Sequence, residues 1–238
     1  MRASPIDPTL PQGDEKVRAV RAMFDTIAPR YDLVNRIMTF RMDVGWRRRT
    51  VRELRLAPGS TVLDLACGTG DFCRELTKGG MVPIGVDLSF GMLAAARTDA
   101  PLLQADILRL PVPDASVDGA TCGFALRNLV ELERFFHELA RVVRPGGRVA
   151  LLEVGEPKYR LLRFGHRIYF GKVVPRIGAL LSDGAAYRYL PKSVAYLPAP
   201  EHMLALLRDA GFVDIERNLL STGISQLIVA TRTPAAHR

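Results

Sequence analysis

The hydrophobic positions follow a helical period at the start of the chain. Residues 17–55 contain few Gly or Pro. Their apolar side chains recur at the spacing of one helix face: Val20, Met23, Phe24 and Ile27. Ala57-Pro58-Gly59 ends the segment. The pattern therefore predicts a helical N-terminal cap over residues 17–58.

After this cap, short apolar runs alternate with amphipathic stretches. The runs predict strands over 61–66, 81–87, 101–106, 117–124 and 148–154. Helices are expected over 71–78, 89–97 and 132–143, the second with Ser89 as its N-cap. Strands that alternate with helices at this spacing indicate a parallel sheet built from βαβ units.

Residues 157–195 interrupt the alternation, because they are basic, aromatic and broken by Gly and Pro. A helix over 201–210 and two strand-like runs, 212–220 and 224–231, follow them, and the last run could return as an antiparallel partner. We expect one α/β domain with a mostly parallel, Rossmann-like sheet and an antiparallel last strand. Its parts are a disordered tail (1–16), a helical cap (17–58), a core (59–156), an inserted lid (157–195) and a C-terminal completion (196–238).

Composition narrows the class of protein. The chain of 238 residues is 48% hydrophobic and 24% charged, which excludes a disordered or collagen-like chain. No apolar run reaches the ~18–20 residues of a membrane-spanning helix, and the polar N-terminus does not resemble a secretory signal. Cys67, Cys73 and Cys122 form no CxxC pair, so neither disulfides nor a metal site are expected. The prediction is a cytoplasmic protein.

The net charge of +8 is concentrated in two segments. Residues 16–55 hold eleven Lys and Arg against four Asp and Glu, and residues 157–182 hold six basic residues and no acid. The rest of the chain is net acidic. Such segments suit phosphates, anionic lipid or water, so charge alone leaves the partner open.

The turn after the first predicted strand is the first candidate ligand-binding site. Gly68-Thr69-Gly70 lets the backbone approach a ligand, although many such turns only pack a helix on a strand. Cys73 stands where a dinucleotide fingerprint needs a third small residue. Asp64 places a carboxylate beside the turn, which would repel a pyrophosphate and attract an ammonium or sulfonium group.

Acidic residues after the next strands complete a nucleoside pocket. Asp87, followed by Leu88, can accept hydrogen bonds from both ribose hydroxyls. Asp106 can accept from an adenine amino group while Ile107 packs on the ring, although Asp106 could also cap its loop. Gly123 and Phe124, at the end of the fourth predicted strand, should line the reactive face. An adenosine with a cationic amino-acid tail fits these positions, and that ligand is S-adenosylmethionine.

Several motifs resemble one family. They are VLDLACGTGD at 62–71, FDTIAPRYDLVN at 24–35, LPVPD at 110–114 with FALRN at 124–128, RPGGR at 144–148 and YRYL at 187–190. Together they resemble class I S-adenosylmethionine-dependent methyltransferases, and within them the UbiE/MenG quinone C-methyltransferases. Two positions depart from that pattern: residues 221–228 lack the family's histidine, and Arg41 replaces a glycine.

The resemblance implies a Rossmann-like methyltransferase that methylates a ring carbon of a reduced polyprenyl quinone, with demethylmenaquinol as the expected acceptor. It places Thr69, Asp87, Asp106, Ile107 and Gly123 on the cofactor. The acceptor would bind among the aromatic and polar residues of the remaining motifs and the end of the fifth strand: Tyr31, Asn35, Glu153, Tyr187, Arg188 and Tyr189. The tyrosines could instead be core aromatics.

Methylation of a quinol carbon requires the phenolate, because its charge activates the ortho carbon. Arg127 cannot act as a base but could stabilise the phenolate and polarise a water molecule, while Asn128 orients the ring oxygen. The proton acceptor could be that water, Asp32 or Glu153. Asp32 could alternatively pair with an arginine of the cap. The four histidines are scattered, and a solvated or satisfied role is expected for each.

Residues 158–182 interleave bases with aromatic and aliphatic side chains. A basic amphipathic helix of this kind lies on anionic bilayers, which would bring the enzyme to a lipophilic quinol. The alternative is a lid that only covers the pocket. A homodimer is compatible with the chain.

Three alternative hypotheses about the function remain. A nucleic-acid methyltransferase suits the charge, but the chain lacks both an (N/D)PP(Y/F) tetrad and a Pro-Cys dipeptide, so no nucleic-acid partner is expected. A diverged C-, O- or N-methyltransferase of a phenolic or other natural product is permitted by the altered final strand. A non-catalytic S-adenosylmethionine-binding protein would bind the cofactor without turnover.

Overall fold

The computed structural model describes residues 11–181, 186, 189 and 193–235. Seven strands form one sheet in the order β3-β2-β1-β4-β5-β7-β6. The strands are β1 (Thr61–Leu65), β2 (Val82–Asp87), β3 (Leu102–Gln104), β4 (Val117–Gly123), β5 (Val143–Val154), β6 (Phe212–Leu220) and β7 (Ser225–Arg232). Strands β1 to β5 pair in parallel, and β7 is antiparallel to both β5 and β6. This confirms the expected Rossmann-like sheet with an antiparallel last strand.

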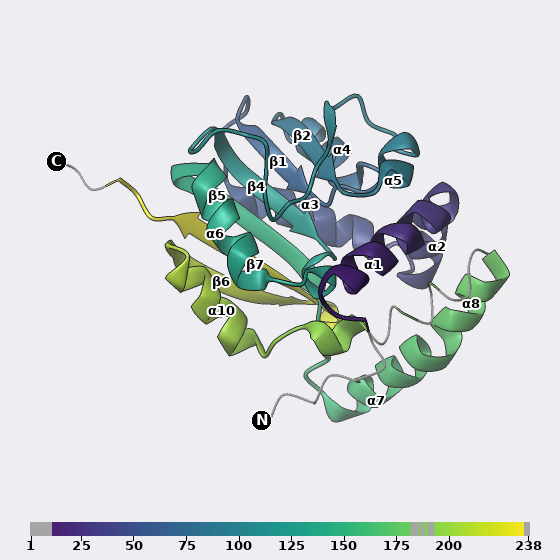
Figure 1. Cartoon of the computed structure of the whole chain (residues 1–238). Coiled ribbons are helices and arrows are strands. Elements are labelled where there is room, and N and C mark those ends of the chain that lie inside the picture. Colours follow the sequence, from purple (N-terminus) through teal and green to yellow (C-terminus); the bar gives the residue numbers. More distant parts are fainter. Residues whose placement is uncertain (1–10, 182–185, 187–188, 190–192, 236–238) are drawn as a thin grey trace.

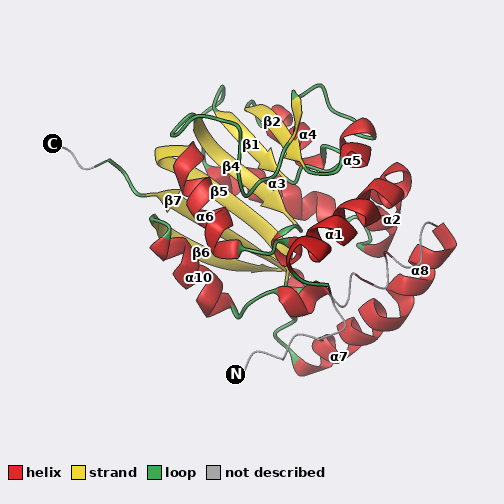
Figure 2. Ribbon diagram, viewed as in Figure 1, coloured by secondary structure: helices red, strands yellow, loops and turns green. Residues whose placement is uncertain are grey.

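Helices cover both faces of the sheet (Figures 1 and 2). The α-helices are α1 (Gly13–Ile27), α2 (Tyr31–Met38), α3 (Met42–Leu54), α4 (Asp71–Lys78), α5 (Phe90–Ala94), α6 (Leu132–Val142), α7 (Arg160–Ile168), α8 (Val174–Leu181) and α10 (Pro200–Asp209). Short 3₁₀ turns are η1 (Ala28–Arg30), η2 (Leu126–Asn128), η4 (Val194–Tyr196) and η5 (Ser221–Gly223), and η3 (Tyr169–Val173) is a π-helical turn between α7 and α8.

The core lies on the two faces of the sheet. Phe135 and Phe136 of α6 and Leu207 of α10 are buried in one cluster. Leu54 of α3 and Leu76 of α4 are buried in a second cluster on the other face. The central strands are buried nearly throughout, as is typical of a parallel sheet covered on both sides. This packing fixes where the strand ends lie.

The strand order reverses beside β1. The chain runs outward from β1 to β2 and β3, and then returns to place β4 on the other side of β1. Loops after β1 and β4 therefore diverge to opposite sides of the sheet, which opens a crevice at the carboxyl ends of the strands. The turn with Gly68 and Gly70 and the loop with Asn128 meet at this crevice.

The N-terminal helix begins earlier than the sequence pattern indicated. Helix α1 starts at Gly13, so residues 13–16 are helical where a disordered tail was expected, and residues 1–10 lie outside the described residues. The reason is visible at Lys16, whose ammonium is buried and donates to two backbone carbonyls of the η2 segment. That contact holds the first turn of α1 on the core.

The turn between α2 and α3 contains two consecutive residues in the left-handed region. Phe40 has φ 51° and Arg41 has φ 60°, and both side chains are exposed. A left-handed conformation costs a residue with a Cβ roughly 1–2 kcal/mol relative to the right-handed one. Arg41 therefore occupies a position that glycine would fill at lower cost.

Helices α7 and α8 form an arm along one side of the molecule, beside α2 (Figure 1). The arm packs through Tyr169, Phe170 and Val174 onto the cluster that contains Val34 and Met38. No helix of the described chain is both long and apolar enough to cross a bilayer.

Candidate active site

The glycine turn is held in place by Asp87. The backbone N–H of Gly68 donates to Asp87 Oδ2 and that of Ser89 donates to Asp87 Oδ1, each at 2.8 Å. Gly68 and Gly70 have φ 55° and 81°, and a Cβ on Gly70 would lie 2.6 Å from Thr98 Cγ2. Glycine is therefore required at position 70 for both conformation and space. Burial raises the pKa of Asp87.

Asp64 lies fully buried on β1 behind this turn. Its carboxylate accepts hydrogen bonds from Thr121 Oγ1 at 3.0 Å and from Cys73 Sγ at 3.4 Å. Burial raises the pKa of Asp64 to about 7, while these two donors act in the opposite direction. The carboxyl is thus poised to lose its proton when a positive charge arrives nearby.

A first cavity occupies the crevice at the strand ends. Six of the nine predicted cofactor residues line it: Gly68, Asp87, Leu88, Asp106, Ile107 and Gly123. The other three do not line this cavity: Asp64 lies behind the turn on β1, and Thr69 and Gly70 belong to the turn itself. A Cβ on Gly123 would lie 2.5 Å from the Phe72 ring, so this position also has no room for a side chain.

Helix α1 forms a further wall of the first cavity, which the sequence analysis missed. Its contribution is mostly apolar: Val17, Val20, Arg21 and Phe24. The helix is fixed at both ends. Lys16 Nζ donates to the carbonyls of Arg127 and Leu129 at 3.0 and 2.9 Å, and Asp25 accepts from Ser89 Oγ and the Gly91 N–H. The ammonium also lies 3.6 Å from the Tyr196 ring centroid, and burial lowers the pKa of Lys16 to about 8.

A second cavity lies between the cap and the arm. Tyr31 and Phe124 line both cavities, so the two spaces share a wall. The second cavity is largely apolar and aromatic: Met38, Phe40, Trp46, Leu161, Leu162, Tyr169 and Phe170 are among its lining residues. Of the predicted acceptor residues, Tyr31 and Asn35 line it, and so does Arg127. Its apolar character suits a flat, lipophilic molecule.

Arg127 is buried and paired with Glu153. The Arg127 guanidinium donates to Glu153 Oε1 and, through Nε, to Ser193 Oγ at 3.1 Å. Glu153 also accepts from the backbone N–H groups of Arg127 and Val154 at 3.2 and 2.8 Å. Glu153 lines neither cavity, and its oxygens are occupied by three donors. This arrangement suits a carboxylate that positions Arg127 better than one that removes a proton.

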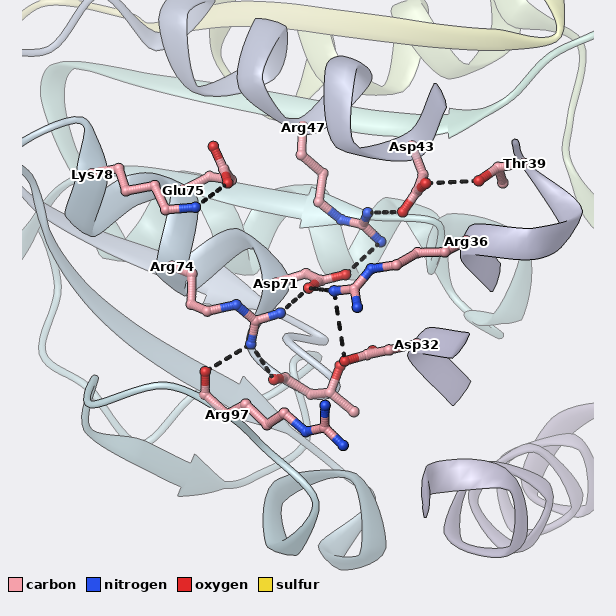
Figure 3. A network of polar contacts seen from close by, with 11 residues as sticks. Asp32, Arg36, Thr39, Asp43, Arg47, Asp71, Arg74, Glu75, Lys78 and Arg97 are labelled. Atoms are coloured by element: carbon pink, nitrogen blue, oxygen red, sulfur yellow. Dashed lines mark hydrogen bonds and ion pairs between the residues drawn. The ribbon is translucent and has the colours of Figure 1, made fainter. Parts of the chain in front are cut away.

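Asp32 lies away from both cavities. Its carboxylate accepts a hydrogen bond from Thr69 Oγ1 and lies 4.0 Å from the Arg36 guanidinium, within the network of Figure 3. Asp32, Arg36 and Thr69 line a third cavity. The alternative that Asp32 pairs with an arginine of the cap is therefore confirmed. As a base, it would have to act from outside the apolar cavity.

Asn128 lines the first cavity, and its Oδ1 lies 3.4 Å from the hydroxyl of Tyr189. Burial raises the pKa of Tyr189 to about 12, so its hydroxyl remains a donor. Tyr187 and Arg188 lie outside the described residues. The structure thus brings Asn128 and Tyr189 together next to Arg127.

Trp46 lines the second cavity although the sequence pattern did not predict it there. It contacts Phe124, the residue expected on the reactive face, with ring centroids 6.2 Å apart, on the wall beside Arg127. A lone tryptophan on a helix is typical of a core, so the pattern alone could not assign Trp46 to a site.

The sheet order with its antiparallel last strand is that of the class I methyltransferase fold. A solved structure from Thermotoga maritima, described as an S-adenosylmethionine-dependent methyltransferase and possible histamine N-methyltransferase, matches 90% of this chain and 99% of its own with a TM-score of 0.63 at 19% identity. At that identity the likeness establishes the fold alone.

The sequence comparison identifies the family. The model of the ubiE/COQ5 methyltransferase family matches residues 12–232, so the chain belongs to that family and is a methyltransferase. A UbiE ubiquinone/menaquinone biosynthesis C-methyltransferase from Syntrophotalea carbinolica is 42% identical, with 90% of this chain and 94% of the relative covered. A demethylmenaquinone methyltransferase from Thermus thermophilus is also 42% identical, with coverage of 88% and 100%.

Proposed function

We propose that the protein methylates a ring carbon of a reduced polyprenyl quinone, with demethylmenaquinol as acceptor and S-adenosylmethionine as methyl donor. The observation that carries this proposal is the shared wall of Tyr31 and Phe124 between a cavity that Asp87 and Asp106 line at the strand ends and an apolar, aromatic cavity. The names of relatives at about 40% identity support the same reaction.

The first cavity fits the donor. Each oxygen of Asp87 accepts one backbone N–H, which leaves a lone pair on each for a ribose hydroxyl. Asp106 and Ile107 would hold the adenine, and the Asp64 charge would favour the cationic amino-acid end. When bound there, S-adenosylmethionine supplies an electrophilic methyl group on a sulfonium. The chain's own task is then to align donor and acceptor across Tyr31 and Phe124.

The second cavity fits the acceptor. The quinol hydroxyl must lose a proton before its ring carbon becomes nucleophilic, and the free phenol titrates near ~10. Arg127 would stabilise the resulting phenolate from the wall of the cavity, since its guanidinium stays protonated. Asn128, held beside Tyr189, lines the first cavity and would have to reach the ring oxygen across the shared wall. Glu153 would fix the Arg127 guanidinium in place.

Membrane contact would occur through residues 158–182. Leu161 and Leu180 are 82% and 83% exposed, and Phe164 is 54% exposed, on an arm that carries six basic residues and no acid. Exposed apolar side chains among basic ones suit the interface of an anionic bilayer. Because Leu161 and Leu162 also line the second cavity, contact through this arm would open that cavity toward the lipid.

A second candidate is a diverged methyltransferase of a phenolic natural product. The segment that departs from the quinone-enzyme pattern reaches the acceptor, because Thr222 and Ile224 line the second cavity. Changes at these positions would alter which ring fits, while the donor cavity would stay the same.

Mass spectrometry distinguishes the two candidates. Purified protein is incubated with S-adenosylmethionine and demethylmenaquinone, with and without a chemical reductant. One methyl group gained on the ring only under reducing conditions supports quinol methylation. Binding of the donor in a calorimeter without any such product would refute it and favour the natural-product acceptor.

Donor affinity should depend on pH. Ionised Asp64 and Asp87 favour the donor, and burial raises the pKa of both, that of Asp64 to about 7. Below that pH the Asp64 carboxyl holds a proton that binding must release. The dissociation constant should therefore fall about tenfold per pH unit as pH rises toward 7 and then level off. Calorimetry across this range tests the prediction, with Asp64→Asn expected to flatten the profile.

A further inference from the structure

The α2–α3 turn presents an exposed apolar face beside the arm. Leu33, Ile37 and Phe40 are exposed, Phe40 to 72%. The Phe40 ring lies 5.8 Å from that of Tyr169 in η3, and both residues line the acceptor cavity. The turn and the arm therefore flank the same opening. An apolar side chain held in the left-handed region with most of its surface in water is an unexplained cost of this fold.

Basic residues surround the cavity next to this face. Arg30, Arg36, Arg41 and Arg97 line the third cavity together with Leu33 and Ile37, and Asp32 is its one acidic lining residue. Arg36 is bound to Asp71 at 3.2 Å, and Arg30 donates to the Leu181 carbonyl at 2.9 Å. Within the described part of the chain, the guanidinium groups of Arg41 and Arg97 have no carboxylate partner, and that of Arg97 carries no dashed line in Figure 3.

We propose that this third cavity binds the phosphate of an anionic phospholipid, with Arg41 and Arg97 on the phosphate and Phe40, Leu33 and Ile37 in the acyl region. The inference rests on the membrane contact proposed above and adds a second point of attachment to the arm. A lipid fits because the cavity combines cationic groups with aliphatic walls and opens beside exposed apolar side chains. The strained Arg41 places its guanidinium at that boundary.

Vesicle binding of the full-length protein tests the proposal. The probes are phosphatidylcholine vesicles with and without phosphatidylglycerol. Each lost positive charge near the bilayer should weaken binding about fivefold, so Arg41→Gly and Arg97→Ala should each do so on the vesicles that contain phosphatidylglycerol. Arg208→Ala, an exposed arginine on α10 over β6, is the matched control and should bind like the wild type.

Arg41→Gly also separates binding from folding. Glycine prefers the left-handed position, so this variant should melt at a higher temperature while it binds vesicles less tightly. Unchanged binding of Arg41→Gly, or an equal loss in Arg208→Ala, would overturn the site. If the protein binds soluble glycerol phosphate but does not bind the vesicles, the cavity is a site for a free phosphate instead. A failure to methylate quinols would leave this binding result intact.

A separate observation concerns His166 on α7. It lines the acceptor cavity, and its ring centroid lies 4.4 Å from that of Phe170. Its Nε2 is buried and has no hydrogen-bond partner among the residues that the structure describes. Burial lowers the pKa of His166, which favours the neutral imidazole. The described carboxylate that lines the same cavity, Asp43, is already bound by Arg47 and Thr39. An unpartnered buried nitrogen requires an explanation.

We infer that His166 Nε2 accepts the hydroxyl proton of the acceptor, an inference that rests on the proposed function. The O–H bond breaks, its electron pair stays on the oxygen as phenolate, and the proton forms N–H on the imidazole. The phenolate would then face Arg127 in the same cavity. The proposal gives His166 a role other than the solvated or satisfied one expected for the four histidines.

Chemical rescue tests His166. His166→Ala should slow single-turnover methyl transfer by on the order of 10²–10⁴-fold, and added imidazole should restore part of the rate, whereas His137→Ala on α6 should react like the wild type. Methyl transfer by His166→Ala at the wild-type rate would refute this role of His166 and indicate that water accepts the proton. A bound naphthol, whose anion absorbs at longer wavelength, gives a readout without turnover: the anion should form in the wild type and not in His166→Gln. An equal anion fraction in both proteins would also refute the role.

Discussion

Arg127→Met is expected to unfold at lower denaturant concentration and to abolish methyl transfer. Arg127 is 6% exposed and Glu153 is fully buried, so the substitution leaves an uncompensated carboxylate in the core. Breaking such a pair costs about 3–5 kcal/mol of folding free energy. The loss of activity has a second cause, because the phenolate would lose its cation. Equilibrium denaturation and the mass-spectrometric assay measure the two effects separately.

A double variant distinguishes folding from chemistry. Arg127→Met/Glu153→Leu removes both charges, so most of the lost stability should return. Methyl transfer should stay absent, because Arg47, which also lines the cavity, is already bound by Asp43 and Asp71. Turnover restored in the double variant would show that Arg127 acts only as a structural partner of Glu153.

Asp87→Ala should weaken donor binding by on the order of 10²–10⁴-fold. The substitution removes the acceptor for two ribose hydroxyls, and hydrogen bonds to a charged group are worth about 1.5–3 kcal/mol each. It also leaves the N–H groups of Gly68 and Ser89 without their acceptor, so the glycine turn loses its support. Calorimetric titration with S-adenosylhomocysteine measures the change.

The matched control is Asp99→Ala, an exposed aspartate in the loop before β3. It should bind the donor product as the wild type does. If Asp87→Ala binds equally well, the first cavity is not the donor site, and the assignment of both cavities would have to be exchanged.

Local sequence patterns predicted the sheet and the residues that line the first cavity, because strand ends and glycine turns are short-range features. The cofactor positions at the ends of β1, β2, β3 and β4 followed from single motifs, and six of them line one cavity. Strand β5 begins at Val143 rather than residue 148, since Val143 pairs with Val117 before the Pro-Gly-Gly turn. Helix α5 ends at Ala94 because the Arg97 N–H instead binds the Thr69 carbonyl.

The remaining site residues depend on contacts between distant segments. Lys16 belonged by composition to a polar tail, yet its partners are carbonyls more than a hundred residues away. The sequence did not indicate a role for His166, which lies in an amphipathic segment, because only tertiary packing buries its Nε2. Asp32 belongs to a motif that indicated a catalytic role, but in the structure its carboxylate contacts Thr69 and Arg36.

The burial of all three thiols protects the protein from its own proposed substrate. Oxidised quinones with an unsubstituted ring position alkylate thiolates. Cys67, Cys73 and Cys122 are buried, and their surroundings raise the pKa of each, so the thiolate form is suppressed at neutral pH. The enzyme can therefore operate where quinol and quinone interconvert without arylation of its core.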